Sequence, residues 1–277
     1  MKRKLLHPSQ RSLIVDWGRI LLAGFVVVHA VLNAHGQSEV TQSNAKATAL
    51  QNSSSAELFE SEGGMSAARR KMMDDALAEP RKVAAAVVAA DFPSPQFIVQ
   101  VGAFQGEFLE VFLDRFPSAR GQWTEAITSE HNLAATKQRF ARFGNRIDFA
   151  FGCARRDLSA GCVLPKQTDV ILLEWLSIQQ DLDGMYKVYR AGAAQLPQGG
   201  WIVNVDHVKF GGNGWEPLVK TAVKEFRHPE VEGPPIHYPQ FQVPTADEQL
   251  AAMRAAGFDA QVVWQSFNTV LFMGRKK

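Results

Sequence analysis

A short apolar run that ends in a glycine loop constrains the fold of this 277-residue chain more than any other segment. Residues 97–101 are apolar except for Gln100, and the loop 102–106 begins and ends with glycine. An amphipathic segment follows, with large apolar side chains at Phe108, Leu109, Phe112, Leu113 and Phe116. This pattern predicts a buried strand, a turn where another molecule approaches the backbone, and a helix whose N-terminus faces that molecule.

Strand-like and helix-like segments alternate from about residue 95 onward. The apolar run 170–173 has no polar residue, which is typical of a strand covered by helices on both faces. Such alternation predicts parallel strands joined by right-handed crossovers. We expect strands at 96–101, 122–127, 147–151, 168–174 and 200–205, and helices at 105–116, 130–142 and 179–195.

The last part of the chain has a different pattern. A helix is expected at 246–256, followed by strands at 261–264 and 269–273. The turn between these two strands is too short for a crossover, so they must form an antiparallel hairpin. The fold class is therefore α/β, with a doubly wound sheet of seven strands, mostly parallel, that closes on an antiparallel pair.

This order of elements resembles the Rossmann-like class I S-adenosylmethionine-dependent methyltransferases. The most specific matches are Asp169–Trp175 for the fourth strand, Leu196–Asp206 for the turn into the fifth strand, and Ala256–Asp259 before the hairpin. The likeness covers about residues 95–275. It implies S-adenosylmethionine as cofactor, lying across the carboxyl ends of strands one, two and four at the topological switch point.

The resemblance places the cofactor against the first glycine loop. The family pattern acid-x-Gly-x-Gly-x-Gly falls on Gln100, Gly102, Phe104 and Gly106, with Ala103 between the first two loop positions. Gly102 and Gly106 are kept, whereas Gln100 replaces the acid and Phe104 replaces the middle glycine. Gln100 can form hydrogen bonds but offers no charge to the ammonium group of the cofactor.

Two further family positions also lack their acid. The carboxylate that accepts the ribose hydroxyls falls on Ile127, with Glu125 or Glu130 as substitutes if the register differs by two or three residues. The acid expected after strand three is replaced at Cys153, next to Ala154. Three missing charged contacts at about 1.5 kcal/mol each would weaken binding about a thousandfold unless other contacts compensate.

Candidate residues for the acceptor side lie at the ends of later strands. Glu174 and Trp175 follow strand four, where family residues flank the point of methyl transfer, and Trp175 either contacts substrate or closes the sheet edge. His207 ends strand five and is either a general base or a loop histidine bonded to backbone. His237 and Tyr238 lie in a proline-rich segment, either a lid over the cleft that contacts substrate or a plain surface loop.

These residues are compatible with two functions. The first is a methyltransferase acting on a small-molecule O or N acceptor, with His207 or His237 as optional base and no metal. The second is an exported or membrane-tethered binding domain that keeps the sheet without catalysis. Net charge argues against nucleic acid as partner, because residues 37–277 hold 25 of the 30 basic and 27 of the 28 acidic side chains and so present no basic excess.

The first 36 residues resemble an export signal, with a basic start, an apolar run at 20–32 and small residues at Ala34 and Gly36. Thirteen residues are short of the roughly 20 that a membrane span needs. The alternative is an uncleaved anchor through residues 13–33. We expect the protein to be exported, to the periplasm or secretory pathway, or membrane-anchored.

The remaining segments complete the predicted organisation. A polar linker occupies 37–64, a helical segment with one or two helices broken near Pro80 occupies 65–94, and the methyltransferase-like domain is 95–277. The two cysteines, Cys153 and Cys162, form a disulfide in an oxidising compartment or remain two free thiols otherwise. The sequence does not indicate the oligomeric state.

Overall fold

The computed structural model describes residues 67–102, 105–125, 130–151, 153, 158, 162–178, 181–210, 214, 215, 217, 218, 221 and 243–277. The predicted leader at 1–36 and linker at 37–64 lie outside these ranges. Among the helices of the described ranges, none combines the length and the apolar character that crossing a membrane requires.

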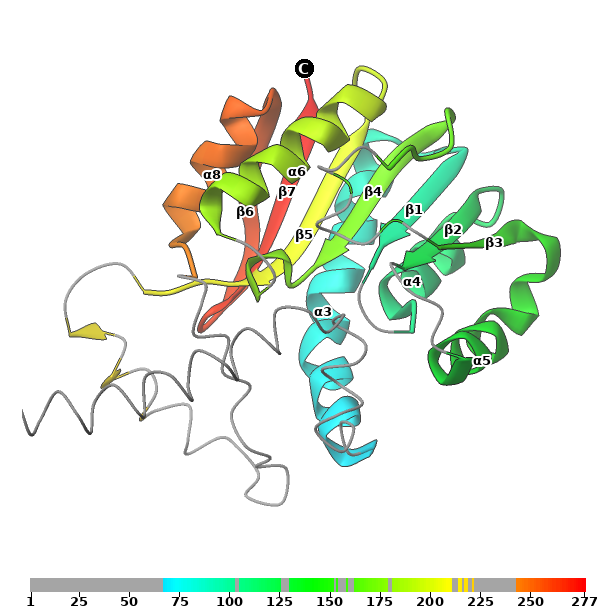
Figure 1. The fold of residues 1–277 in the computed structure, drawn as a ribbon, viewed down its shortest axis with the longest axis horizontal. Helices are drawn as coiled ribbons and strands as arrows, with labels where there is room; N and C mark the ends of the chain where they lie inside the picture. The colour runs from blue at the N-terminus through cyan, green and yellow to red at the C-terminus, as the bar shows by residue number, and fades with distance from the viewer. Residues whose placement is uncertain are drawn as a thin grey trace, which may run out of the picture. The chain divides into compact units, whose positions relative to one another are not determined.

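A seven-stranded sheet forms the centre of the described chain, with the strand order β3-β2-β1-β4-β5-β7-β6 (Figure 1). The first five strands pair in parallel, whereas β7 pairs antiparallel with both β5 and β6. The predicted mixed sheet with its antiparallel C-terminal hairpin is therefore confirmed. The strands are β1 (Phe97–Val101), β2 (Arg120–Glu125), β3 (Ile147–Phe151), β4 (Thr168–Glu174), β5 (Trp201–His207), β6 (Phe258–Ser266) and β7 (Thr269–Lys276).

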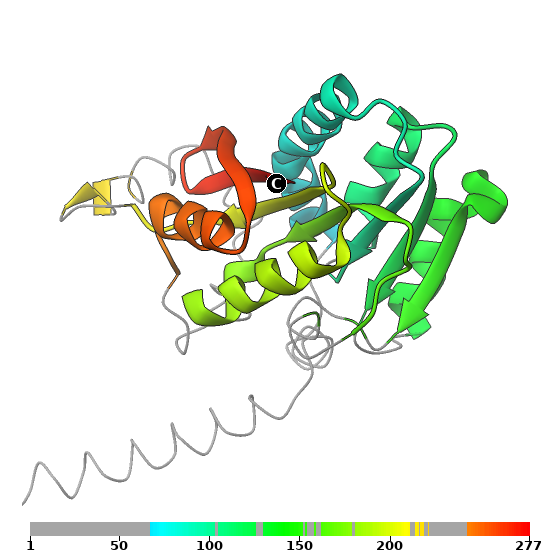
Figure 2. The same ribbon diagram turned by 90° about the horizontal axis from the view of Figure 1, so that it is seen from above.

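Helices cover both faces of the sheet (Figure 2). On one face lie α3 (Ala67–Asp91), α4 (Glu107–Arg115) and α5 (Glu130–Phe140), and on the other α6 (Leu182–Gln195) and α8 (Ala246–Ala255). Short 3-10 turns, η1 (Ala141–Arg146) and η3 (Leu176–Ile178), follow α5 and β4. Successive residues of β4 alternate between the two apolar cores, which explains why its sequence is continuously apolar.

The helix α3 differs from its prediction, because it runs unbroken for 25 residues with Pro80 inside it. A proline in a helix removes one hydrogen bond and crowds the preceding turn. Leu77, Ala84 and Val88 on the same stripe are buried in the core shared with α4 and the sheet. This burial offsets the local cost of Pro80, so the helix continues through it.

The strand β2 begins and ends two residues earlier than predicted. Its second residue, Gly121, pairs with Ile98 of β1 and packs beneath Leu109 and Leu113 of α4. A Cβ atom on Gly121 would lie 3.0 Å from Leu109 Cδ1, so this glycine allows α4 to approach the sheet. With this earlier register, Glu125 is the last residue of the strand as the structure describes it.

Candidate functional site

The carboxyl ends of the parallel strands β1, β2, β4 and β5 lie along one edge of the sheet (Figure 1). Several of the candidate residues stand at or next to these strand ends. Val101 pairs with Thr124, and the next residue, Gly102, donates its N–H to the Thr124 carbonyl at 2.8 Å. Gly102 is therefore adjacent to Glu125. On the other side of β1, Gln100 pairs with Leu172 of β4, and this register, extended by two residues, brings Gly102 level with Glu174.

The two glycines at the ends of the loop have a backbone conformation that favours glycine. Gly102 has a φ of 67° and Gly106 a φ of 89°, both in the left-handed region that favours glycine. Ala103 and Phe104 lie outside the described residues. Gly106 is also required by packing, because a Cβ atom there would lie 2.4 Å from Phe140 Cε2.

Replacing Gly106 with alanine is expected to lower the free energy of unfolding by about 2–3 kcal/mol, measured by urea denaturation. About 1 kcal/mol comes from the left-handed backbone, and the rest from the clash with the Phe140 ring. Gly257→Ala is the matched control, because Gly257 has a φ of 103° with no atom within 4 Å of the added Cβ. Equal losses in the two variants would show that Phe140 imposes no constraint.

Gln100 is fully buried, and its amide bonds to the backbone of the loop and of α4. Its Oε1 accepts from Leu109 N at 2.9 Å, and its Nε2 donates to the Gly102 carbonyl at 3.5 Å. Leu109 N belongs to the first turn of α4, where backbone donors have no partner within the helix. Gln100 thus shapes the loop and caps the helix that follows it.

Glu125 is the half-buried acid at the end of β2, beside the glycine loop. Its carbonyl accepts from Cys153 N at 3.4 Å, which joins this strand end to the residue after β3. Ile127 and Ala154 are not among the described residues, nor is the side chain of Glu130. Among the described residues, Glu125 is thus the acid at this strand end, and it is the substitute expected from the sequence for a two-residue shift.

Glu174 ends β4 as a fully buried carboxylate, and its partner is a residue that our sequence reasoning missed. Arg81 of α3 is 3% exposed and donates from Nε to Glu174 Oε1 at 2.7 Å. Its Nη1 donates to Asp74 at 3.4 Å. Burial alone would lower the pKa of Arg81, but Glu174 and its neighbours raise it above its usual value, so the guanidinium stays charged. In the sequence, Arg81 could have been found as a basic residue on the otherwise apolar stripe between Leu77 and Val88.

Trp175 and His207, predicted separately, lie together at the ends of β4 and β5. Their ring centroids are 5.0 Å apart, with the planes tilted by 46°. Trp175 has a φ of 53°, which is rare for a residue with a bulky side chain and often marks a functional site. The backbone N–H of Trp175 donates to the Val205 carbonyl at 2.8 Å, which fixes this bend to β5. His237 and Tyr238 are outside the described ranges.

A buried polar network lies next to this ring pair. Asp206 accepts from Ser177 Oγ at 2.6 Å, Ser177 N at 3.0 Å, Asn204 Nδ2 at 3.0 Å and His207 N at 2.8 Å. Tyr189 Oη of α6 donates to Gln249 Oε1 of α8 at 2.8 Å. Burial raises the pKa of Asp206, although its hydrogen bonds oppose the shift. The network therefore fastens η3, which follows Trp175, to β5.

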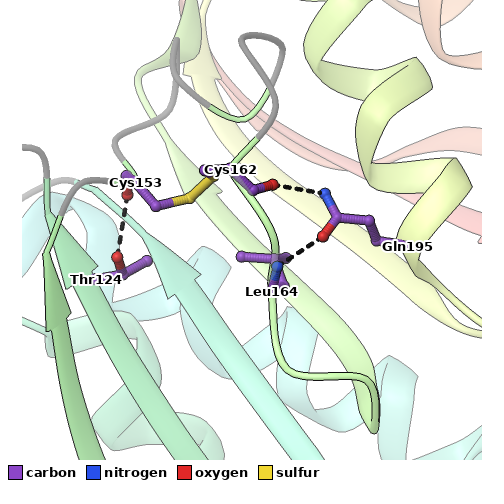
Figure 3. Close-up of a disulfide and its surroundings, with 5 residues drawn as sticks. All are labelled: Thr124, Cys153, Cys162, Leu164 and Gln195. Atoms are coloured by element: carbon purple, nitrogen blue, oxygen red, sulfur yellow. Dashed lines mark hydrogen bonds between the residues drawn. A yellow bond between two sulfur atoms is a disulfide. The ribbon is translucent and has the colours of Figure 1, made fainter.

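The two cysteines form a disulfide, Cys153–Cys162, with 5.5 Å between the Cα atoms, so the alternative of two free thiols is wrong (Figure 3). The carbonyl of Cys153 accepts from Thr124 Oγ1 at 3.2 Å. The carbonyl of Cys162 accepts from Gln195 Nε2 at 3.2 Å. The bridge thus links the ends of β2 and β3 to the last residue of α6.

The described part of the chain contains no group of three or more His, Cys, Asp or Glu side chains arranged to hold a metal ion.

Comparison with solved structures shows that the fold is that of the class I S-adenosylmethionine-dependent methyltransferases. An O-methyltransferase family protein from Burkholderia thailandensis matches with a TM-score of 0.53 at 17% identity, over 75% of this chain and 59% of that chain. A putative O-methyltransferase from Nostoc punctiforme has a TM-score of 0.54 at 16% identity, over 74% and 58%.

An O-methyltransferase family 2 protein from Planctomyces limnophilus, solved in complex with apigenin, has a TM-score of 0.52 at 16% identity, over 75% of this chain and 61% of that chain. This chain spans less than two thirds of the length of each of these three proteins. Its sequence matches no family model and no curated protein.

Proposed function

We propose that this protein is an S-adenosylmethionine-dependent methyltransferase that acts on an oxygen or nitrogen atom of a small molecule. The observation that carries the proposal is the meeting of Gly102, Glu125 and Glu174 at one edge of the sheet. In the methyltransferase fold this edge receives the ligand. When bound, the cofactor supplies an electrophilic methyl group.

The residues at this edge fit such a cofactor. The carboxylate of Glu125 can accept two hydrogen bonds from ribose hydroxyls, which replaces the acid that the sequence pattern lacked at Ile127. Gly102 allows a ligand to approach the backbone closely. Within the described chain, the buried Nη2 atom of Arg81 has no hydrogen-bond partner, as expected where a ligand supplies one.

The acceptor would lie against Trp175 and His207. The Trp175 ring offers an apolar wall, and the half-buried imidazole of His207 would accept a proton from the hydroxyl or amine of the acceptor. The rate would come mainly from holding the acceptor in line with the methyl group. His237 and Tyr238 remain part of the proposal as a lid over this acceptor site.

Titration calorimetry of the full chain with S-adenosylhomocysteine tests this function. We expect Glu125→Gln to weaken binding about tenfold to a hundredfold, because the charged acceptor of the ribose hydroxyls is lost. Glu79→Gln on the exposed part of α3 is the control and should bind like the wild type. Apigenin is a reasonable first acceptor for methyl-transfer assays, since the Planctomyces neighbour was solved with it.

The second candidate is a binding domain without catalysis. It is favoured by Gln100, whose uncharged amide contacts the loop and α4 at the position of the family acid. If the wild type gives neither heat nor a thermal shift with millimolar S-adenosylhomocysteine, the methyltransferase proposal fails and this candidate takes its place.

We also propose that the chain is exported or membrane-anchored through residues 13–33, and that its partner is a small molecule rather than nucleic acid. The disulfide supports the first of these, because such bonds persist in oxidising compartments. The lack of basic excess in residues 37–277 supports the second.

A further inference from the structure

The ion pair between Arg81 and Glu174 is buried at the proposed ligand edge, and stability alone does not account for it. Arg81 is 3% exposed and Glu174 is 0% exposed. Two charges removed from water lose their hydration, and an apolar pair of similar volume often stabilises a protein as well or better. The position of this ion pair at the ligand edge therefore indicates a functional role.

The guanidinium of Arg81 also has hydrogen-bonding capacity left over. Its Nε donates to Glu174 and its Nη1 to Asp74. Its Nη2 is buried and finds no hydrogen-bond acceptor in the described chain. Arginine has five N–H donors in a planar fork that suits carboxylates. A buried donor without an acceptor is uncommon in native proteins, and a bound ligand can explain it.

Strand register places this pair beside the glycine loop. Glu174 follows Leu172 by two residues, and Gly102 follows Gln100 by two residues, while Gln100 and Leu172 pair directly. Extended by two residues, this register puts Glu174 level with Gly102 on the neighbouring strand, and the guanidinium of Arg81 is bonded to Glu174. A ligand held against that loop comes within reach of Arg81 and Glu174 together.

The surrounding charge restricts the ligand further. Besides Glu174, the carboxylates of Asp74 and Glu107 act on Arg81. A group that carries only negative charge would be repelled by these acids. A zwitterionic α-amino acid group adds no net charge, because its carboxylate faces Arg81 while its ammonium faces an acid.

We propose that Arg81 and Glu174 together bind the α-amino acid end of the cofactor, with Arg81 Nη2 donating to the α-carboxylate and Glu174 accepting from the α-ammonium. A carboxylate accepts several hydrogen bonds, so Glu174 can keep Arg81 while it takes the ammonium. This inference rests on the proposed function. It gives α3, which precedes the wound sheet in the chain, a direct part in ligand binding.

Two ligands and two matched variants test the inference by calorimetry on the full chain. The ligands are S-adenosylhomocysteine and its decarboxylated form, which lacks only the α-carboxylate. The wild type should bind S-adenosylhomocysteine about tenfold to a hundredfold more tightly than the decarboxylated form. Arg81→Lys keeps the charge beside Glu174 but removes the fork, so this preference should fall to about threefold or less.

Arg142→Lys is the control, because Arg142 is exposed and pairs with Glu110 and Asp114 away from Glu174. It should keep the full preference. The inference is overturned if the wild type binds both ligands equally, a result that needs no variant to fold. It is also overturned if Arg81→Lys keeps the preference or weakens both ligands alike. Failure of the wild type to bind S-adenosylhomocysteine at all would instead remove the proposed function, and this inference with it.

Discussion

Replacing Asp206 with alanine is expected to lower the free energy of unfolding by about 3–5 kcal/mol. The carboxylate accepts four hydrogen bonds, from Ser177 N and Oγ, Asn204 Nδ2 and His207 N. Asp206, Ser177 and Asn204 are fully buried, so the donors left behind could not turn to water. Each unsatisfied buried donor costs about 1–3 kcal/mol, reduced here by local relaxation. Urea denaturation at neutral pH measures the loss.

Asp206→Asn separates the hydrogen bonds from the burial of a charge. Its amide oxygen still accepts part of the set, so we expect a smaller loss of about 1–2 kcal/mol. Asp148→Ala is the surface control, because Asp148 is 48% exposed and pairs with the exposed Arg120. Its loss should stay within about 1 kcal/mol. If Asp206→Ala behaves like Asp148→Ala, the network does not hold η3 against β5.

The titration of Asp206 adds a pH dependence whose sign follows from its pKa. Burial raises the pKa of Asp206 in the folded protein, so the folded state binds the proton more tightly than the unfolded chain. The contribution of this group to stability is therefore largest below the ordinary aspartate pKa, and it is lost as pH rises through the raised value. Asp206→Asn cannot titrate. As pH rises from the ordinary aspartate pKa to the raised value, the unfolding free energy of the wild type should therefore fall relative to that of Asp206→Asn. A wild type that gains stability relative to Asp206→Asn over this range would contradict the raised pKa.

Hydrophobic pattern predicted the centre of this fold well, because the central strands are buried on both faces. The run 170–173 could be placed as a strand without knowledge of its partners, and β4 spans it. The helix expected at 246–256 is also present as α8, and the structure adds that Thr245 and Glu248 form a capping box at its start. The short turn between β6 and β7 allowed only an antiparallel pair, which the structure confirms.

The errors occurred where a tertiary contact outweighs a local signal. Pro80 indicates a helix break, but the burial of Leu77 and Val88 on the same stripe keeps α3 continuous. The predicted strand began at residue 122, yet Gly121 lies inside β2, where α4 packs directly over it. A local pattern shows which face of a helix is apolar, but not which residues of the sheet that face will cover. Both errors therefore followed from reading segments one at a time.

The candidate site was only partly visible for the same reason. Trp175 and His207 were expected at the ends of two strands, and their contact follows from the pairing of β4 with β5. Glu125 required the register of β2, which differs by two residues from the expectation. Arg81 required the packing of α3 across the sheet, a relation between segments 93 residues apart.

Reduction of the disulfide between Cys153 and Cys162 is expected to destabilise the folded protein by about 2.5 kcal/mol and to lower Tm by about 5–10 °C. The two cysteines are nine residues apart, and the bond restricts the unfolded chain over that loop. It also joins Cys153, held by Thr124 of β2, to Cys162, held by Gln195 of α6 (Figure 3). Calorimetric melting with and without a phosphine reductant measures the shift.

The double variant Cys153→Ala/Cys162→Ala controls for effects of the reductant itself, and its Tm should not respond to the phosphine. Thiol titration of the treated wild type must find two thiols per chain, which shows that the bond was opened. An unchanged Tm after both thiols are found would mean that the disulfide contributes nothing to stability. A lower Tm together with weaker binding of S-adenosylhomocysteine would show that the disulfide also supports the ligand site. Cys153 N donates to the carbonyl of Glu125, so the disulfide would then hold the end of β2 in place for the ligand.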